Sequence, residues 1–302
     1  MKVNIVTIQG SWILRKIADR IKENNRDKNV FFKVTHQEDP SADINFYVDL
    51  QNTYCGQKTN CDIAYFTHAH ENSIDWTAQT FQNQGCGNLK AITSMNKRYT
   101  DMLIELGCPT DRIITLTPGE TYKMFPLKKI VIGVCSRGGY PGYGDGFLCD
   151  LFSKNKFKNF EFKFLGVEWD NVKSITKKRR IKAEYIEDET YEKYPEFYKG
   201  IDYLLVPGLW TAGPMSAQEA LSTGTPIIGA NVGFMNYEFA PDYGFEPGDE
   251  VGLMNILGQI EKPLIDRRKQ VEGMRHWKYT RDLVRFFKTI QKLDGENWAK
   301  SK

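Results

Sequence analysis

The sequence of 302 residues contains no run of about 18 apolar residues, the length that a membrane-spanning helix needs. Its first residues, MKVNIVTIQGSW, also lack the long apolar segment and the small-residue cleavage site of a signal peptide. We therefore expect no transmembrane helix and a cytoplasmic location. Internal repeats and low-complexity tracts are missing too, while 41% of the residues are hydrophobic, which is enough to fill two domain cores.

Cysteine is scarce, with six residues, and its spacing does not suit a zinc site. Cys55 and Cys61 form no CxxC pair and have no histidine nearby that would complete a ligand set. Cys108 and Cys149 lie in apolar stretches, where buried thiols are expected. A loop disulfide from Cys55 to Cys61 or Cys86 is the alternative to free thiols, although a chain without a secretion signal does not favour it.

Apolar, β-branched runs alternate with helical patterns along almost the whole chain. Strands are predicted at residues 3–8, 31–35, 44–50, 62–68, 89–94, 112–117, 129–135, 160–166, 182–186, 202–208 and 226–230. Helical spacing is found at 11–24, 73–84, 96–107, 145–155, 191–200 and 215–224, and again in the tail at 250–260 and 275–293. Strands that alternate with helices predict an α/β fold with right-handed crossovers and parallel sheets.

The pattern restarts near residue 127, where a stretch with linker character precedes a fresh strand and the glycine-rich loop SRGGYPGYGDG. We therefore expect two Rossmann-like domains, 1–127 and 128–275, with parallel sheets facing a central cleft. The C-terminal helix at 276–302 is expected to pack back on the first domain. Ligands of such sheets bind where loops leave the carboxyl ends of the strands, so the cleft suits an enzyme that joins two substrates.

The stretch WTAGPMSAQEALSTGTPIIGANVG contains a predicted ligand site. A buried strand is followed by a loop, and a helix begins near Pro214. The backbone from Gly213 through Met215 to Ser216 then forms a helix start, where N–H groups and the helix dipole favour phosphate. Glu219 lies about one and a half turns further on, where its carboxylate can accept hydrogen bonds from two ribose hydroxyls. The alternative is a solvent-exposed glutamate on a helix that only packs.

The same block resembles the donor site of the retaining GT-B glycosyltransferases of the "glycosyl transferases group 1" family. The shared pattern consists of Pro207, Glu219, Ala220, Gly224, Pro226 and Ile227. The resemblance implies a GT-B fold and the transfer of a sugar from a nucleotide diphosphate sugar to an acceptor hydroxyl, with retention of configuration and without a metal cofactor. It implies further that Glu219 binds the ribose and that the Gly213–Ser216 amides hold the diphosphate or the sugar. Thr211 stands where the family carries a second glutamate.

The resemblance also assigns roles after the strand at 129–135. Ser136 and Arg137 match the position where the family places the arginine that pairs with the donor diphosphate, and a guanidinium can grip phosphate in a bidentate way. The alternative is a surface loop cation. Where the family has a lysine before a glycine, this sequence has Asp145. Lys173 or Lys177 is the candidate substitute for that lysine.

In the N-terminal domain, the resemblance places Gly10 beside the donor phosphates. It also places a histidine after the strand at 62–68, near the transferred sugar or the reacting centre. His68 matches this position best, and His70 is the alternative. Metal binding by His68, His70 and Glu71 would need a fourth ligand that the sequence does not offer, so we expect no metal.

A basic run suggests a further partner. Its members are Lys173, Lys177, Lys178, Arg179 and Arg180, in a chain of net charge +3. The run is either a solvated helix face or a patch for phosphates of an anionic membrane or of nucleic acid.

The acceptor is accordingly expected to be a surface glycan or a lipid-linked sugar at the inner membrane face. DNA with hydroxymethylated bases, as used by phage enzymes of this fold, is the alternative acceptor. Other functions compatible with the residues are a non-catalytic sugar-nucleotide binder and an epimerase. The sequence suggests no obligate protein partner.

Overall fold

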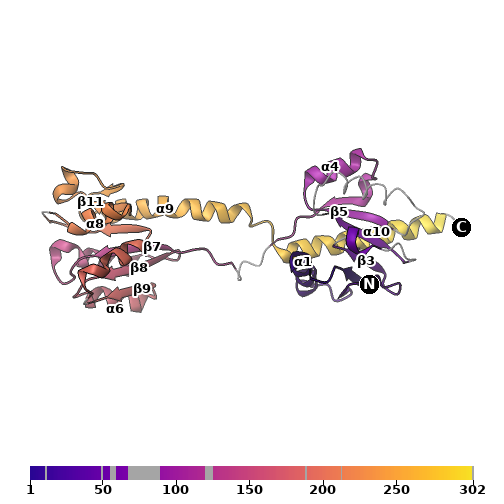
Figure 1. Cartoon of the computed structure of the whole chain (residues 1–302), viewed down its shortest axis with the longest axis horizontal. Coiled ribbons are helices and arrows are strands. Elements are labelled where there is room, and N and C mark those ends of the chain that lie inside the picture. The colour runs from indigo at the N-terminus through magenta and orange to yellow at the C-terminus, as the bar shows by residue number, and fades with distance from the viewer. Residues whose placement is uncertain are drawn as a thin grey trace. The chain divides into compact units, whose positions relative to one another are not determined.

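A computed structural model of the chain describes residues 1–10, 12–48, 50–54, 59–66, 89–119, 125–187, 189–211 and 213–300 (Figure 1). The chain folds into two compact units. Unit 1 consists of Met1–Phe125 and Lys269–Lys302, and unit 2 consists of Pro126–Arg268. The chain thus passes between the units twice, after Phe125 and after Arg268. The boundaries predicted from the sequence lie after residues 127 and 275.

Unit 1 is built around strands β1 (Lys2–Val6), β2 (Phe31–Thr35), β3 (Ile44–Tyr47), β4 (Asp62–Phe66), β5 (Leu89–Ser94) and β6 (Ile113–Thr115). They form one parallel sheet in the order β2-β1-β3-β4-β5-β6. The helices are α1 (Trp12–Glu23), α2 (Leu50–Thr53), α4 (Lys97–Glu105) and α10 (His276–Lys300), with the 3-10 turn η1 (Thr110–Arg112). Helix α10 belongs to this core, because Phe287 packs edge-on against Phe46 of β3 at a centroid distance of 5.2 Å.

Unit 2 contains strands β7 (Ile130–Cys135), β8 (Phe160–Leu165), β9 (Ala183–Ile186), β10 (Tyr203–Val206), β11 (Ile227–Ala230) and β12 (Tyr243–Phe245). Its helices are α5 (Asp145–Lys154), α6 (Asp170–Arg179), α7 (Tyr194–Lys199), α8 (Met215–Thr223) and α9 (Glu250–Gln270), with 3-10 turns η2 (Pro141–Tyr143), η3 (Tyr191–Lys193) and η4 (Gly233–Asn236). The sheet is parallel, in the order β12-β11-β10-β7-β8-β9.

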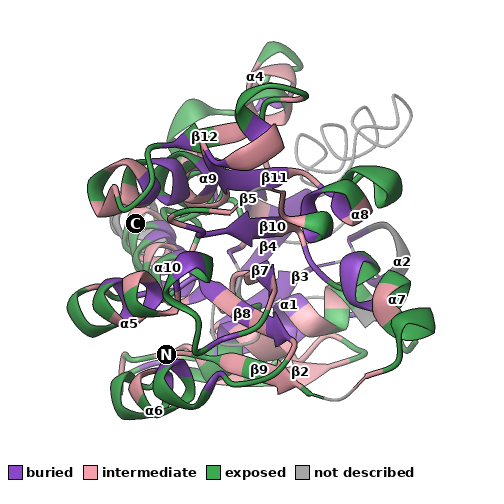
Figure 2. Ribbon diagram, turned by 90° about the vertical axis from the view of Figure 1, so that its left-hand side faces the viewer, coloured by how far each residue is buried: buried purple, intermediate pink, exposed green. Residues whose placement is uncertain are grey.

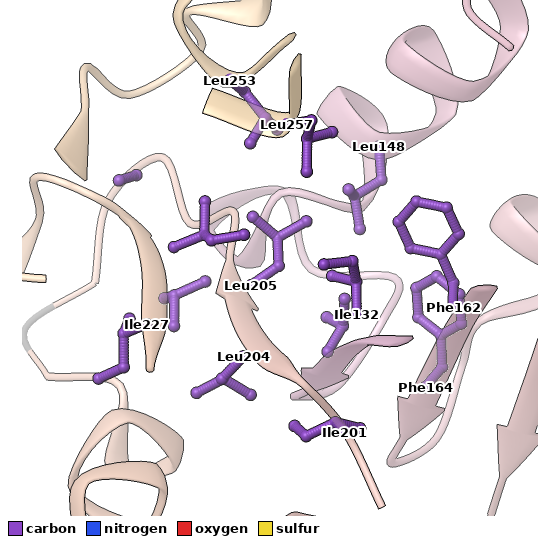
Figure 3. Close-up of a cluster of buried hydrophobic side chains, with 14 of the residues drawn as sticks. Ile132, Leu148, Phe162, Phe164, Ile201, Leu204, Leu205, Ile227, Leu253 and Leu257 are labelled. Carbon is purple, nitrogen blue, oxygen red and sulfur yellow. The ribbon is translucent and has the colours of Figure 1, made fainter. Parts of the chain in front are cut away.

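Both faces of the unit 2 sheet are covered, which explains its nearly continuous apolar strands. Helices α5 and α6 lie on one side and α7 and α8 on the other (Figure 2). Figure 3 shows the resulting core, in which Leu204 and Leu205 of β10 point to opposite faces of the strand among buried side chains. Each such fully buried side chain contributes roughly 1.5–3 kcal/mol to the stability of the unit.

The predicted fold class is confirmed, since the units are α/β structures with parallel sheets. All eleven predicted strands are present, with ends that differ by a few residues. The strand predicted at 44–50 stops at Tyr47, and α2 begins at Leu50 instead. Strand β12 was not predicted, because three residues that include Gly244 give too short a pattern. The helix predicted at 73–84 lies outside the described residues.

The glycine-rich loop after β7 is packed tightly against the loop after β10. Gly144 caps α5 in a left-handed conformation, with φ of +86°, and an added Cβ would come 2.2 Å from the carbonyl oxygen of Pro207. We expect Gly144→Ala to lower the unfolding free energy by about 3 kcal/mol, from backbone strain and this clash. Thermal and urea unfolding followed by circular dichroism would measure it.

The control for this change is Gly258→Ala, which adds a methyl group in the middle of α9, where nothing lies within 4 Å. That substitution should raise stability by about 0.5–1 kcal/mol. Equal effects of the two substitutions would contradict the tight loop contact.

Candidate functional site

The candidate site lies where the strand order of unit 2 reverses. Strands β7 and β10 are neighbours, yet the connection after β7 leads toward β8 and the one after β10 leads toward β11. The two loops diverge and leave a crevice at the carboxyl edge of the sheet, which is the usual ligand site of such folds. A cavity of about 340 Å³ opens there. It is lined by Cys135, Ser136, Arg137, Tyr143, Tyr194, Leu205, Val206, Pro207, Gly208, Thr211, Gly213, Pro214, Met215, Ser216 and Glu219.

The start of α8 forms one wall of this cavity. Among the hydrogen bonds of the described residues, none is donated by the backbone amides of Gly213, Met215 or Ser216. Pro214 between them carries no N–H, and its carbonyl accepts from Ala217 at 2.9 Å. All three residues line the cavity, so three amide donors and the positive end of a helix lie at the crevice, an arrangement that suits an anion such as phosphate.

Glu219 is half-buried in the cavity and is held by tyrosines. The Tyr198 hydroxyl donates to Glu219 Oε2 at 2.6 Å, and the interaction with Glu219 is also the largest cause that raises the pKa of Tyr191. Burial, followed by the nearby Cys135, raises the pKa of Tyr198, so its phenol stays protonated and keeps donating. A carboxylate offers about four acceptor positions, which leaves Glu219 with capacity for ligand hydroxyls.

Arg137 extends from the end of β7 beside the cavity, but it already has a partner. Its guanidinium forms a bidentate ion pair with Glu168, in which Arg137 Nε lies 2.8 Å from Glu168 Oε2 and Arg137 Nη2 contacts Glu168 Oε1. The hydrogen bond from Arg137 lowers the pKa of Glu168, so the carboxylate stays charged. Both side chains are largely exposed, and water and a competing anion can reach the pair.

Asp145, at the position where the family has a lysine, accepts hydrogen bonds from two backbone amides. Its Oδ1 accepts from the Gly146 amide at 2.8 Å and its Oδ2 from the Gly139 amide at 3.2 Å. Asp145 therefore ties the glycine-rich loop to the first turn of α5, a position where an acidic residue also suits the helix dipole. Ser136 contributes a buried hydroxyl with no hydrogen-bond partner among the described residues.

A second, wider hollow of about 750 Å³ adjoins the cavity. It shares Tyr143, Thr211 and Gly213 with the first, and is further lined by Tyr140, Trp210, Val232 and Gly233. Tyr140 and Tyr143 lie with ring centroids 4.9 Å apart, and Trp210 is 58% exposed. Thr211 thus lies between the cavity that contains Glu219 and the aromatic hollow.

The basic residues of α6 are not part of this cavity. Helix α6 runs from the carboxyl edge of β8 back to the amino edge of β9, so Lys177, Lys178, Arg179 and Arg180 at its end lie at the far edge of the sheet. Lys173 is paired with Glu187 at 3.6 Å. The structure therefore does not bring Lys173 or Lys177 to the cavity as a substitute for the missing lysine. Four of the five cations gather at a helix C-terminus, which favours positive charge in any case.

Of the site residues predicted in unit 1, the structure describes only Gly10. Gly10 follows β1 with φ of +90° and nothing within 4 Å of an added Cβ, so the backbone there is accessible. His68, His70 and Glu71 lie outside the described residues. Within the described part of the chain, no group of three or more His, Cys, Asp or Glu side chains is placed to hold a metal ion. Nor does that part contain a helix long and apolar enough to cross a membrane.

Sequence reasoning missed Tyr191, Tyr198, Cys135 and Glu168. The tyrosines carry a readable signal, because positions 191, 194 and 198 follow the spacing of one helical face, which here turns toward Glu219. Burial raises the pKa of the Cys135 thiol to about 11. This thiol is therefore a neutral wall of the cavity and no nucleophile at ordinary pH.

No protein family model matches the chain, and no curated protein matches it. Solved structures with a similar arrangement include the lipopolysaccharide outer core galactosyltransferase WaaB, with 12% identity, 99% of this chain and 100% of that chain covered, and a TM-score of 0.38. Anabaena HepE in complex with UDP-glucose is 10% identical, with 98% of this chain and 100% of that chain covered and a TM-score of 0.39. Sucrose-phosphate synthase from Thermosynechococcus elongatus is 10% identical, with 99% of this chain and 100% of that chain covered and a TM-score of 0.40.

The Tyr198–Glu219 hydrogen bond should stabilise unit 2 as well as shape the site. We expect Tyr198→Phe to lower the unfolding free energy by about 1–2 kcal/mol, since it removes a buried hydrogen bond to a charged acceptor while keeping the ring. Tyr194→Phe is the matched control, because no hydrogen bond of the Tyr194 hydroxyl is found in the described structure. Calorimetric unfolding of both variants measures the difference, and equal values would contradict the stabilising role.

Proposed function

We propose that the chain is a glycosyltransferase that moves a sugar from a nucleotide diphosphate sugar to an acceptor hydroxyl. The observation that carries this proposal is the half-buried Glu219 in a cavity lined also by Gly213, Met215 and Ser216, whose amides donate no hydrogen bond among the described residues. An anion site and a carboxylate acceptor, one and a half helical turns apart, match a diphosphate joined to a ribose. The crevice at the order reversal is the position where a Rossmann-like sheet binds such ligands.

In this proposal each wall of the cavity meets one part of the donor. The three amides at the start of α8 hold the diphosphate, and Glu219 accepts hydrogen bonds from the ribose hydroxyls. Arg137 moves from Glu168 to the phosphates and stabilises the charge that develops on the leaving group, a role that a metal ion plays elsewhere. The transferred sugar extends past Thr211 toward the aromatic hollow, where ring faces of Tyr143 and Trp210 offer apolar contact.

The remaining features of the reaction come from the family resemblance. It implies retention of configuration at the transferred sugar and an acceptor bound by unit 1. We propose a surface glycan or a lipid-linked sugar as the acceptor. A DNA acceptor would require the basic end of α6 to take part, yet that cluster lies at the sheet edge opposite the cavity.

One observation favours a second function, a non-catalytic sugar-nucleotide binder. Glu168 neutralises the only guanidinium that lines the described cavity, and Thr211 replaces the glutamate that reads the sugar in the family. A protein with these features would bind the nucleotide through Glu219 and α8 and release no product. Release of free nucleoside diphosphate that depends on an acceptor separates the enzyme from the binder.

The ribose role of Glu219 can be tested by Glu219→Gln. We expect the dissociation constant of a nucleotide diphosphate sugar, chosen from a panel that varies base and sugar, to rise by roughly ten- to a hundredfold. The reason is that hydroxyls lose a charged acceptor, and such hydrogen bonds are worth about 1.5–3 kcal/mol. Isothermal titration calorimetry measures the change, and Gln218→Ala, one position earlier and exposed, is the control. Unchanged affinity and turnover in Glu219→Gln would overturn the assignment.

Loss of the ion-pair partner of Arg137 should strengthen binding, whereas loss of the Glu219 carboxylate should weaken it. Glu168→Gln should free the guanidinium for phosphate and lower the dissociation constant of a nucleoside diphosphate by about fivefold at low salt, with a smaller gain at high salt because both groups are exposed. The control is Glu161→Gln, which removes a carboxylate that lies on β8, the strand before Glu168, and pairs with Lys182. If Glu168→Gln weakens binding instead, Glu168 positions Arg137 and does not compete with the ligand.

A further inference from the structure

Unit 1 contains a cavity that the proposed glycosyl transfer does not use. Its volume is about 350 Å³, and it lies between the segment that follows α1 and the first half of α10. The two helices pack against each other, as Figure 1 shows. The lining residues are Asn24, Asn25, Arg26, Asp27, Trp277, Thr280, Arg281, Val284, Arg285 and Lys288.

Thr280 is an unusual member of this lining. The residue is 1% exposed, and its Oγ1 finds no hydrogen-bond partner in the described structure. Buried hydroxyls are normally paired, and a threonine inside a helix can satisfy itself on the carbonyl of the preceding turn. A hydroxyl that does neither, on a cavity wall, is available to a ligand.

The charges around the cavity do not cancel. Four cations line it, and two carboxylates pair with them. Asp27 lies 2.6 Å from Lys288, and Asp282 takes both Arg281 at 2.9 Å and Arg285 at 3.6 Å. Arg26 has no ion pair among the residues that the structure describes. Two positive charges therefore remain in excess, and guanidinium groups keep their charge at any ordinary pH.

Two of these guanidinium groups are held in place by an aromatic ring. The guanidinium carbons of Arg26 and Arg281 lie 5.4 and 5.3 Å from the centroid of the Trp277 indole ring. A cation–π contact orients the planar group but occupies none of its N–H donors. Arg281 also donates from its Nε to Asp282 at 2.9 Å. Trp277 thus presents the guanidinium fork of Arg26 and the terminal Nη groups of Arg281, donors of the kind that bind phosphate oxygens.

From these observations we infer that the cavity is a binding site for a phosphate monoester. The excess of two positive charges matches a dianion, the guanidinium donors match its oxygens, and the Thr280 hydroxyl supplies a further donor. The volume exceeds that of the phosphate alone and leaves room for a small polar organic group. Such a ligand is either a free phosphorylated metabolite or a phospholipid headgroup, which share this chemistry.

Titration calorimetry with the full chain tests the inference, with glycerol phosphate as the free probe and phosphatidic acid vesicles as the lipid probe. We expect binding of at least one probe. In the double variant Arg26→Gln, Arg281→Gln, binding should weaken by about a hundredfold, roughly tenfold for each lost charge-assisted hydrogen bond. The probe that shows this loss identifies the source of the phosphate. Binding of neither probe, or binding that the double variant leaves unchanged, would overturn the site.

Two further variants separate binding from folding and from charge. Thr280→Val keeps the shape and removes an unpaired buried hydroxyl, so it should leave the melting temperature without ligand unchanged or raise it, while affinity falls about fivefold. Lys178→Gln, Arg179→Gln removes the same number of charges from the end of α6 in unit 2 and should leave affinity within about twofold. An equal loss in this control would mean that only net charge attracts the probe, and would refute the inference.

Discussion

The order reversal between β7 and β10 is the constraint on which the candidate site depends. A right-handed crossover can leave a parallel strand toward either neighbour, and in unit 2 the chain moves one way after β7 and the other way after β10. Two adjacent strands therefore end without a connection covering them. The backbone amides at the start of α8, the side chain of Arg137 and the carboxylate of Glu219 all meet in this gap because topology leaves it open.

Packing around the gap decides which of these groups stay available. Glycine at position 144 lets the loop after β7 approach Pro207, which brings the two loops together at the base of the crevice. Tyr198, a buried residue of α7, fixes Glu219 from the protein side through a 2.6 Å hydrogen bond. The ligand side of the carboxylate is left for hydroxyls. Buried contacts thus hold Glu219 and the two loops in place, whereas the exposed Arg137–Glu168 ion pair can open when an anion binds.

The fold was readable from the sequence because parallel strands that are buried on both faces produce apolar runs such as IVIGVC and YLLV, bounded by turn residues. Glu219 and the start of α8 were readable for a related reason, since a helix that begins at Gly-Pro after a buried strand fixes where its amides point. Glu168 was not readable. It meets Arg137 across 31 residues, and it does so from a left-handed backbone conformation that no local pattern announces. Strand β12 was not predicted because three residues are too few to show an alternating hydrophobic pattern. The cavity in unit 1 was not predicted because Arg26 and Trp277 are brought together only by the packing of α10.

The two sites hold their arginines in different ways, and the difference bears on what each can bind. In unit 2, Arg137 is fixed by a carboxylate that satisfies the same N–H donors a phosphate would use, so an incoming anion must displace Glu168 before it gains the guanidinium. In unit 1, the indole of Trp277 orients Arg26 and Arg281 without occupying an N–H donor. Asp282 accepts from the Nε of Arg281, and the Nη groups of Arg281 and the guanidinium of Arg26 have no carboxylate partner in the described structure. Where the arginine has a carboxylate partner, an anion replaces one ion pair by another, so the net gain in binding free energy is small and depends on salt. Where the arginine has an aromatic partner, the anion forms new hydrogen bonds without breaking an ion pair, and the side chain is already ordered before the ligand binds. Of the two, the cavity beside α10 is therefore the one already prepared for a phosphate, whereas the donor cavity relies on its amides and on Glu219 to bring a nucleotide within reach of Arg137.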